Sequence, residues 1–207
     1  MAKPKSDLKR TDASQAIYQI KVTLLGSEPP IWRRLLVPLD MTLAHLHHVV
    51  QAAMGWHDDH MHEFLIGRRR FGAPEPRDSF MGGPACINEA KVGIAEVLTR
   101  VGSKAEYTYD FGDSWEHVIK VEKVLTAAAG VIYPLCTDGK SNAPPEDCGG
   151  IGGFYNMLEA ISDPNHPEHE DIKDWMGADF DPESFSLDAV NQRLRKRFPP
   201  ARKNRQT

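Results

Sequence analysis

The sequence has few cysteines and no long apolar run. Its three cysteines, Cys86, Cys136 and Cys148, are widely spaced and form no CxxC pair. This number and spacing argue against a disulfide framework and predict free thiols in a reducing compartment. No apolar stretch approaches the roughly 20 residues that span a bilayer, and residues 1–10 are charged with no apolar segment behind them. We therefore expect a cytoplasmic protein without a membrane partner.

Negative charge is concentrated in the middle of the chain, although the net charge is only −4. Residues 193–207 carry seven Lys or Arg and no acid, and residues 1–10 carry four Lys or Arg and one Asp. The intervening residues 11–192 hold a net charge of −14, which disfavours duplex binding by the folded body. The basic tail can contact phosphates, so nucleic acid is one alternative partner and a solubilising role is the other.

The composition is that of an ordinary globular protein, with 41% hydrophobic and 26% charged residues,. A length of 207 residues suits one domain with its own core,. The two ends, residues 1–15 and 199–207, are polar and lack periodicity. We expect a disordered basic leader over 1–15, a single domain over 16–198 and a disordered basic tail over 199–207.

The first elements of the domain are predicted to be a hairpin and a helix. Apolar residues alternate with polar ones over 17–24, and residues 31–37 are typical of the returning strand,. Thr42 is placed to cap a helix over 43–54, and Gly55 is placed to end it,.

The remaining pattern completes an α+β fold. It predicts a strand over 62–66, a short helix over 94–101, a hairpin of 105–109 with 115–124, a loop over 126–153, and helices over 154–162, 167–176 and 187–198,. This order favours a mixed β-sheet wrapped around a helix, in a β-grasp-like hairpin-helix-strand-hairpin arrangement followed by C-terminal helices.

Histidines crowd one short stretch, because six of the nine lie between residues 45 and 62. His60 and His62 are two residues apart at the start of a predicted strand, so their side chains leave one face. His117 is in phase with Trp115 on another predicted strand and could approach from the facing hairpin. These three histidines suit a divalent metal ion, and hydrogen-bonded structural histidines are the alternative. His47, on the apolar face of the predicted helix, is interpreted as a core histidine.

Two acidic segments and two arginines could complete a pocket. Carboxylates in the predicted turn at 110–114 can bind a cation, share a proton or cap the turn. The string at 144–150 joins prolines, acids, a thiol and glycines, which would let its backbone approach a ligand closely. Adjacent arginines on the second strand leave opposite faces, so we expect one of them to pair with this acidic loop. The full candidate pocket comprises Arg33, Arg34, His60, His62, Asp110, Asp113, Trp115, His117, Glu146, Asp147 and Cys148.

Several strings together resemble the Ri-plasmid (pRiA) open-reading-frame-three family over about residues 16–198. They are PPIWRR at 29–34, AMGW at 53–56, and the segments at 60–64, 107–117, 145–150 and 180–183. The resemblance implies a largely uncharacterised family whose members occur on plasmids and transposable elements as well as chromosomes. Some members carry a transposon-resolvase label, yet neither a YxRxS serine setting nor an HxxR with a later tyrosine occurs here. Serine or tyrosine recombinase catalysis is therefore not expected.

Three functional hypotheses follow from these residues. The leading one is a binding or accessory module with a His-, Asp- and Glu-lined pocket. The second is a metal-dependent hydrolase that uses the same pocket, with a metal-bound water as nucleophile and Asp113 or Glu146 as base. The third is a DNA-associated accessory of a mobile element that acts through its basic tail.

Overall fold

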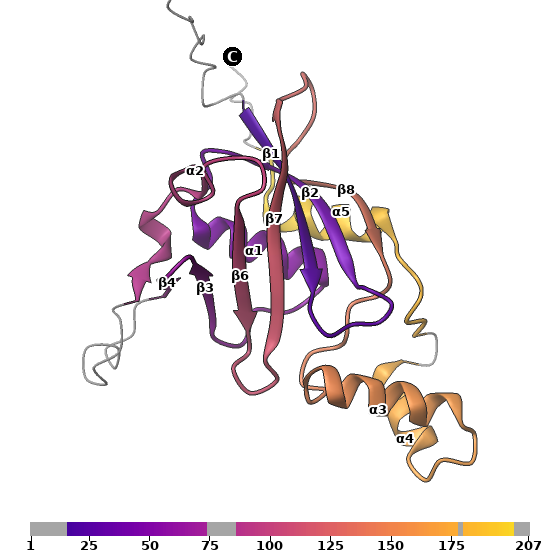
Figure 1. Cartoon of the computed structure of the whole chain (residues 1–207). Coiled ribbons are helices and arrows are strands. Elements are labelled where there is room, and N and C mark those ends of the chain that lie inside the picture. Colours follow the sequence, from indigo (N-terminus) through magenta and orange to yellow (C-terminus); the bar gives the residue numbers. More distant parts are fainter. Residues whose placement is uncertain (1–15, 74–85, 178–179, 201–207) are drawn as a thin grey trace, which may run out of the picture.

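The computed structural model describes residues 16–73, 86–177 and 180–200, which form a mixed eight-stranded sheet with helices (Figure 1). The expected leader and most of the expected tail lie outside these residues. The strands run in the order β5-β4-β3-β6-β7-β1-β2-β8, and the β4/β5 pair is parallel while all others are antiparallel. The α+β class predicted from the sequence is confirmed.

The elements have the following bounds. The strands are β1 (Ala16–Leu24), β2 (Trp32–Pro38), β3 (His62–Ile66), β4 (Arg69–Gly72), β5 (Ile87–Asn88), β6 (Lys104–Tyr109), β7 (Trp115–Thr126) and β8 (Leu135–Lys140). The helices are α1 (Leu43–Met54), the 3-10 helix η2 (Glu89–Lys91), α2 (Ile94–Val97), α3 (Gly150–Ser162), α4 (His169–Met176) and α5 (Leu187–Arg197). None of the helices in the described part of the chain has the length and apolar character to cross a membrane.

Helix α1 has the predicted ends. The Thr42 hydroxyl accepts a hydrogen bond from the His45 backbone N–H at 3.3 Å, and this satisfies one of the free donors of the first turn,. Gly55 takes a left-handed conformation with φ of 93°, which glycine adopts without steric cost,. The ends of α1 matter because the chain that follows Gly55 carries the polar residues of the candidate site.

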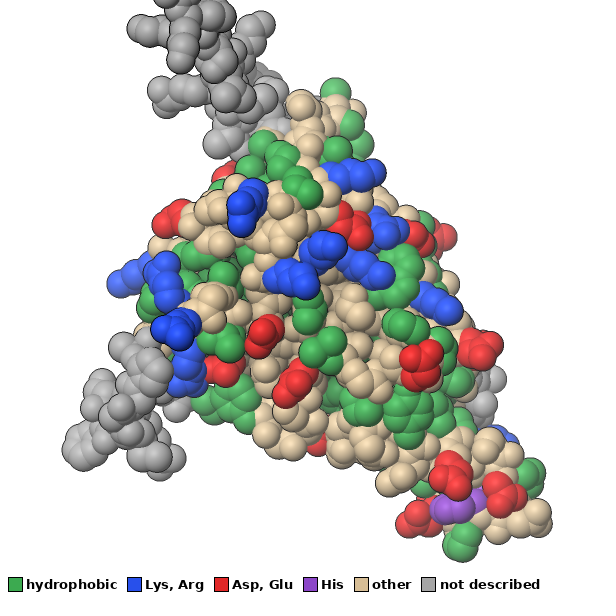
Figure 2. All heavy atoms as spheres, in the orientation of Figure 1, with side chains coloured by type: hydrophobic (Ala, Val, Ile, Leu, Met, Phe, Trp, Pro, Cys, Tyr) green, Lys and Arg blue, Asp and Glu red, His purple; other side chains and the backbone are tan. Residues whose placement is uncertain are grey.

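The helices α1 and α5 lie on one face of the sheet (Figure 1), and the core fills the space between. Aromatic side chains from β3, β6 and β7 point into this layer, and Trp115, Tyr107 and Phe64 are fully buried. Asn191 fixes α5 on the edge strand β8, since its side-chain amide bonds the backbone N–H and C=O of Cys136 at 2.8 and 2.9 Å. On the opposite face, Figure 2 shows lysines and arginines over the middle strands, with hydrophobic side chains among them.

Several parts of the predicted pattern differ in the structure, and the strands β4 and β5 were not predicted. Residues 135–140 were predicted as loop, yet they form the edge strand β8. Its sequence shows no alternation because Cys136 is its one buried residue and a register shift interrupts its pairing with β2,. Helix α2 ends at Val97 rather than 101, and α3 begins at Gly150 rather than 154. The helices α3 and α4 project together from one end of the sheet (Figure 1).

Candidate functional site

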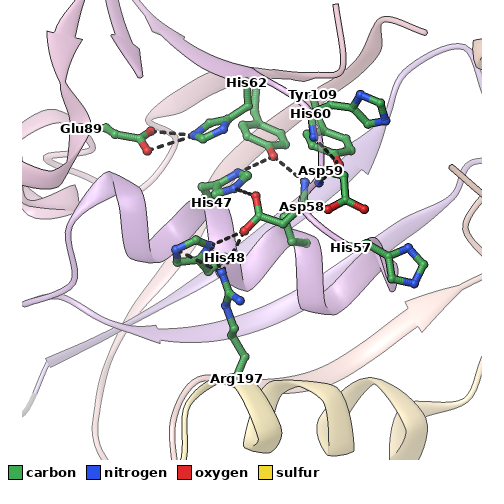
Figure 3. A network of polar contacts seen from close by, with 12 residues as sticks. His47, His48, His57, Asp58, Asp59, His60, His62, Glu89, Tyr109 and Arg197 are labelled. Atoms are coloured by element: carbon green, nitrogen blue, oxygen red, sulfur yellow. Dashed lines mark hydrogen bonds and ion pairs between the residues drawn. The ribbon is translucent and has the colours of Figure 1, made fainter. Parts of the chain in front are cut away.

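The short connection from α1 to β3, residues 57–60, lies at the centre of a polar network (Figure 3). Its sequence is His-Asp-Asp-His, and three of its four side chains contact three different parts of the chain. His57 Nδ1 lies 2.6 Å from a carboxylate oxygen of Glu146, which belongs to the segment before α3. Asp58 points inward to α1, and His60 points toward Asp110 and Asp147.

Asp58 joins two histidines of α1 to an arginine of α5. One carboxylate oxygen contacts Nε2 of His47, and the other lies 3.1 Å from Nδ1 of His48 and 2.8 Å from Nη2 of Arg197. The donor atoms of His47, His48 and Asp58 all lie within 4.8 Å of one another. His47, His48 and Asp58, the first cluster, therefore bring two imidazoles and a carboxylate together. The two imidazoles come from neighbouring residues of α1.

The imidazoles of His47 and His62 stack face to face. Their ring centroids are 3.4 Å apart and their planes are 3° from parallel. His62 Nε2 lies 3.0 Å from both carboxylate oxygens of Glu89, so each stacked ring has its own acidic partner. Burial, and then the neighbouring His62, lower the pKa of His47 to about 3,. The His47 ring is therefore neutral at physiological pH.

Two residues behind His47 orient its ring. Its Nδ1 lies 2.8 Å from the Tyr107 hydroxyl, which also receives a hydrogen bond from Gln51 Nε2 at 3.0 Å. The Gln51 Oε1 atom is buried without a partner among the described residues. With the Gln51 amide turned over, Tyr107 would donate to Oε1 and accept from His47 Nδ1–H. The unprotonated Nε2 of His47 would then face Asp58. Tyr107 and Gln51 can therefore support either tautomer of His47.

A pocket of about 250 Å³ opens beside the stacked rings. Its lining combines imidazoles with two carboxylates and consists of His47, His48, Asp58, His60, Met61, His62, Ala73 and Glu89. Such a lining can hold a metal ion, or a polar ligand that exchanges hydrogen bonds with imidazole and carboxylate groups.

A second cluster forms where His60 meets the acidic segments predicted from the sequence. His60 Nε2 lies 2.9 Å from Asp147 Oδ1 and 3.7 Å from Asp110 Oδ2, and the three donor atoms lie within 4.8 Å of one another. The other Asp110 oxygen accepts the Gly112 backbone N–H at 2.9 Å. Asp113 accepts the Gly149 N–H at 3.1 Å and so holds the two acidic segments together. The side chain of Asp147 is 71% exposed.

The three histidines predicted as joint metal ligands are separated in the structure. His60 and His62 belong to the second cluster and the stacked pair, respectively. His117 is buried on the same face of the sheet, where its Nδ1 bonds the Trp115 carbonyl oxygen at 2.9 Å. Burial lowers the pKa of His117 to about 4,. Neither His/carboxylate cluster found in the described part of the chain includes His117.

The predicted arginines lie away from the acidic loop. Arg33 is buried, and it donates to the carbonyl oxygens of Ala53 and Lys140 at 3.2 and 3.0 Å. Arg34, on the opposite face of the sheet, pairs with Glu122 and Asp138. The expectation that one of them pairs with residues 146–150 therefore does not match the observed contacts, because the backbone carbonyls and the strand neighbours offer closer partners.

Two further candidates are buried in the structure. Trp115 has no exposed surface, and Cys148 is 4% exposed. Burial raises the pKa of the Cys148 thiol to about 12, so it is protonated at physiological pH and is a poor nucleophile,.

The predicted pocket did not include the first cluster, its partner Arg197 or the pocket residue Glu89. His47 was interpreted as a core residue, and it is indeed buried, although its ring also contacts Asp58. Asp58 could have been identified from the sequence, because it lies between histidines directly after the end of a predicted helix. Arg197 could not have been found, because only the packing of α5 brings it to α1.

Comparisons with known proteins place the chain among relatives without an assigned activity. Residues 16–189 match the family described as plasmid pRiA4b ORF-3-like protein. An uncharacterised protein of Sinorhizobium fredii, y4hQ, is 36% identical over 179 residues, which cover 86% of this chain and 90% of that protein. A crystal structure of a protein of unknown function from Methanosarcina mazei is similar with a TM-score of 0.76 and 38% identity, over 84% of this chain and 97% of that chain.

Proposed function

The chain belongs to the plasmid pRiA4b ORF-3-like family, and we propose that it is a binding module for a divalent transition-metal ion held by His47, His48 and Asp58. The observation that carries this proposal is the gathering of the three donor atoms within 4.8 Å of one another beside an open pocket. Two imidazoles and one carboxylate are donors that suit Zn²⁺, Fe²⁺ and Ni²⁺ better than Ca²⁺ or Mg²⁺.

The surroundings of these three residues suit an ion. Tyr107 and Gln51 hold the His47 ring from behind, as outer partners of ligating histidines do in metal sites,. The positive charge of Arg197 now neutralises Asp58, and this side chain is 47% exposed. A metal ion bound at Asp58 would neutralise the carboxylate in place of Arg197, and the Arg197 side chain would turn toward solvent.

The first cluster is a better candidate than the second. In the second cluster the Asp147 side chain is 71% exposed, so few neighbours hold its carboxylate in place. Ligand atoms that are already held in place lose less conformational entropy on binding. In the first cluster His47 is buried, and the Asp58 side chain is 22% exposed.

A metal-dependent hydrolase is the second candidate function. It is favoured by the number of donors, because three protein ligands beside a pocket leave a coordination position for water, as in catalytic zinc sites. The two bases suggested by the sequence, Asp113 and Glu146, do not line this pocket. Glu89, which lines the pocket, is the carboxylate placed to act as base.

The test is titration of the metal-stripped full chain with Zn²⁺, Ni²⁺ and Mn²⁺ by calorimetry. We expect one ion per chain, with Zn²⁺ or Ni²⁺ preferred over Mn²⁺, and Asp58→Asn should weaken binding by more than roughly tenfold. Asp59→Asn is the matched control, since Asp59 is adjacent, exposed and outside both clusters. Its affinity should equal that of the unmodified chain.

Asp147→Asn separates the two clusters. The proposal predicts that this variant binds the ion normally, because Asp147 belongs only to the second cluster. Loss of binding in Asp147→Asn with retention in Asp58→Asn would move the ion to the second cluster and overturn the assignment. Absence of binding at millimolar metal would overturn the proposal as a whole. Hydrolysis of p-nitrophenyl phosphate or acetate by the Zn²⁺-loaded chain, lost in Glu89→Gln, would support the second candidate.

A further inference from the structure

We infer a second ligand site, for a small organic anion, in the pocket between the end of α1 and the basic face of α5. This pocket has a volume of about 420 Å³, within the range of about 300–1,000 Å³ that is typical of small-molecule sites. The inference goes beyond the metal site, and the two side chains that carry it, Arg193 and Lys196, take no part in either His/carboxylate cluster.

The basic face follows from helical spacing and from how α5 is anchored. Arg193, Lys196 and Arg197 stand at positions i, i+3 and i+4, so they share one side of the helix,. The buried side, which includes Asn191 and Leu194, packs on β8 and the core. The three basic residues therefore stand on the side of α5 that lines the pocket at the end of α1.

Gly55 brings the Arg193 guanidinium close to the end of α1. Arg193 Nε donates to the Ala52 carbonyl oxygen at 2.9 Å, which satisfies one of the last free acceptors of α1,. A Cβ at position 55 would lie 3.3 Å from Arg193 Cζ, so the absence of a side chain makes room for the guanidinium. The remaining nitrogens of Arg193 can then donate into the pocket.

Two of the cations have no acidic partner. The ion pairs among the described residues include Arg197 with Asp58, and none with Arg193 or Lys196. Asp58 is the one carboxylate in the lining, and it is already shared by Arg197, His47 and His48. Two unpaired cations that face one cavity favour an anion, and an arginine fork suits a phosphate or carboxylate in particular.

Part of the pocket lining is apolar, which points to an anion that carries an apolar group. Ala52, Gly55 and Trp56 form this part. The Trp56 indole N–H donates to the Pro144 carbonyl oxygen at 2.9 Å, so it is not available to a ligand, and the 8% of Trp56 that is exposed can make apolar contact alone. A flat ring attached to a phosphate or carboxylate would place its charge at Arg193 and Lys196 and its ring on this apolar part of the lining.

The test is calorimetric titration of the full chain in EDTA with four probes: phenyl phosphate, benzoate, inorganic phosphate and phenol. We expect an aromatic anion to bind at least about tenfold more tightly than inorganic phosphate, because the bare ion leaves the apolar part of the lining in water, and phenol to bind negligibly. A preference between phenyl phosphate and benzoate identifies the charged group. EDTA removes metal ions, so failure of the metal proposal would leave this result unaffected.

A pair of matched variants locates the bound anion. Lys196→Gln should weaken binding of the preferred anion by roughly two- to fivefold, as expected for the loss of one solvent-exposed charge pair. Arg195→Gln makes the same change of charge one residue away, outside the pocket lining, and should leave the affinity unchanged. Equal weakening in both variants would show diffuse charge attraction and overturn the inference. So would phenol binding as tightly as the anions, or no binding of any probe at millimolar concentration.

Discussion

Acid should destabilise the protein through His117, and the structure gives the size of the effect. The ring is fully buried, and burial without any charged neighbour lowers its pKa from 6.5 to about 4. Between these two pH values the unfolded chain binds a proton that the folded chain does not, so stability is complete above pH 6.5 and falls as the pH decreases toward 4. Each unit in this window costs about 1.4 kcal/mol, which amounts to about 2 kcal/mol by pH 5.

The assay is urea unfolding at pH 7.5 and pH 5.0, for the unmodified chain and for His117→Phe. Phenylalanine keeps an aromatic ring against Tyr107, whose ring centroid lies 5.5 Å from that of His117, and it cannot take up a proton. We expect the unmodified chain to lose about 2 kcal/mol more than the variant between the two pH values. His166→Gln, a change on the α3–α4 connection, is the control and should behave as the unmodified chain does. An equal acid-induced loss with and without His117 would refute the reasoning.

Other changes test packing contacts that position the site, each by urea or thermal unfolding. Trp115→Ala should cost about 3–5 kcal/mol, because Trp115 is fully buried, and a stable variant would contradict this. Gly153→Ala should destabilise strongly, because its Cβ would meet the Cys148 carbonyl oxygen at 1.8 Å. Gly152→Ala, in open space on the same helix, should stabilise by up to about 1 kcal/mol,. Asn191→Ala should cost about 2 kcal/mol or more, because Cys136 would lose both backbone partners; a smaller loss would mean that α5 docks by apolar contact alone.

The elements with strong periodicity could be predicted from the sequence, and the irregular ones could not. The hairpin β1–β2, helix α1 and strand β3 have clear alternation or clear caps, and their observed bounds match within one residue. Strand β8 has neither signal, because Cys136 is its one buried residue and a register shift interrupts its pairing with β2. Its place is set by long-range pairing, which a local pattern does not contain.

Parity arguments from the sequence gave part of the candidate site. They put His60 and His62 on one face and His117 in phase with Trp115. In the structure His62 and His117 have the cross-strand neighbours Tyr109 and Tyr107, which are both buried. The parity arguments could not show that the ring of His62 would stack on His47, because that contact depends on how α1 lies across the sheet. The same holds for Arg197, which reaches the site only through the docking of α5.

The central claim is that a transition-metal ion binds between α1 and the segment that follows it. The most direct measurement is an anomalous difference map at the zinc absorption edge from crystals of the full chain grown with Zn²⁺. We predict one strong peak within about 2.0–2.2 Å of donor atoms from His47, His48 and Asp58, with the Arg197 side chain moved away from Asp58. A peak at His60, Asp110 and Asp147 instead, or no peak at either cluster, would contradict the account.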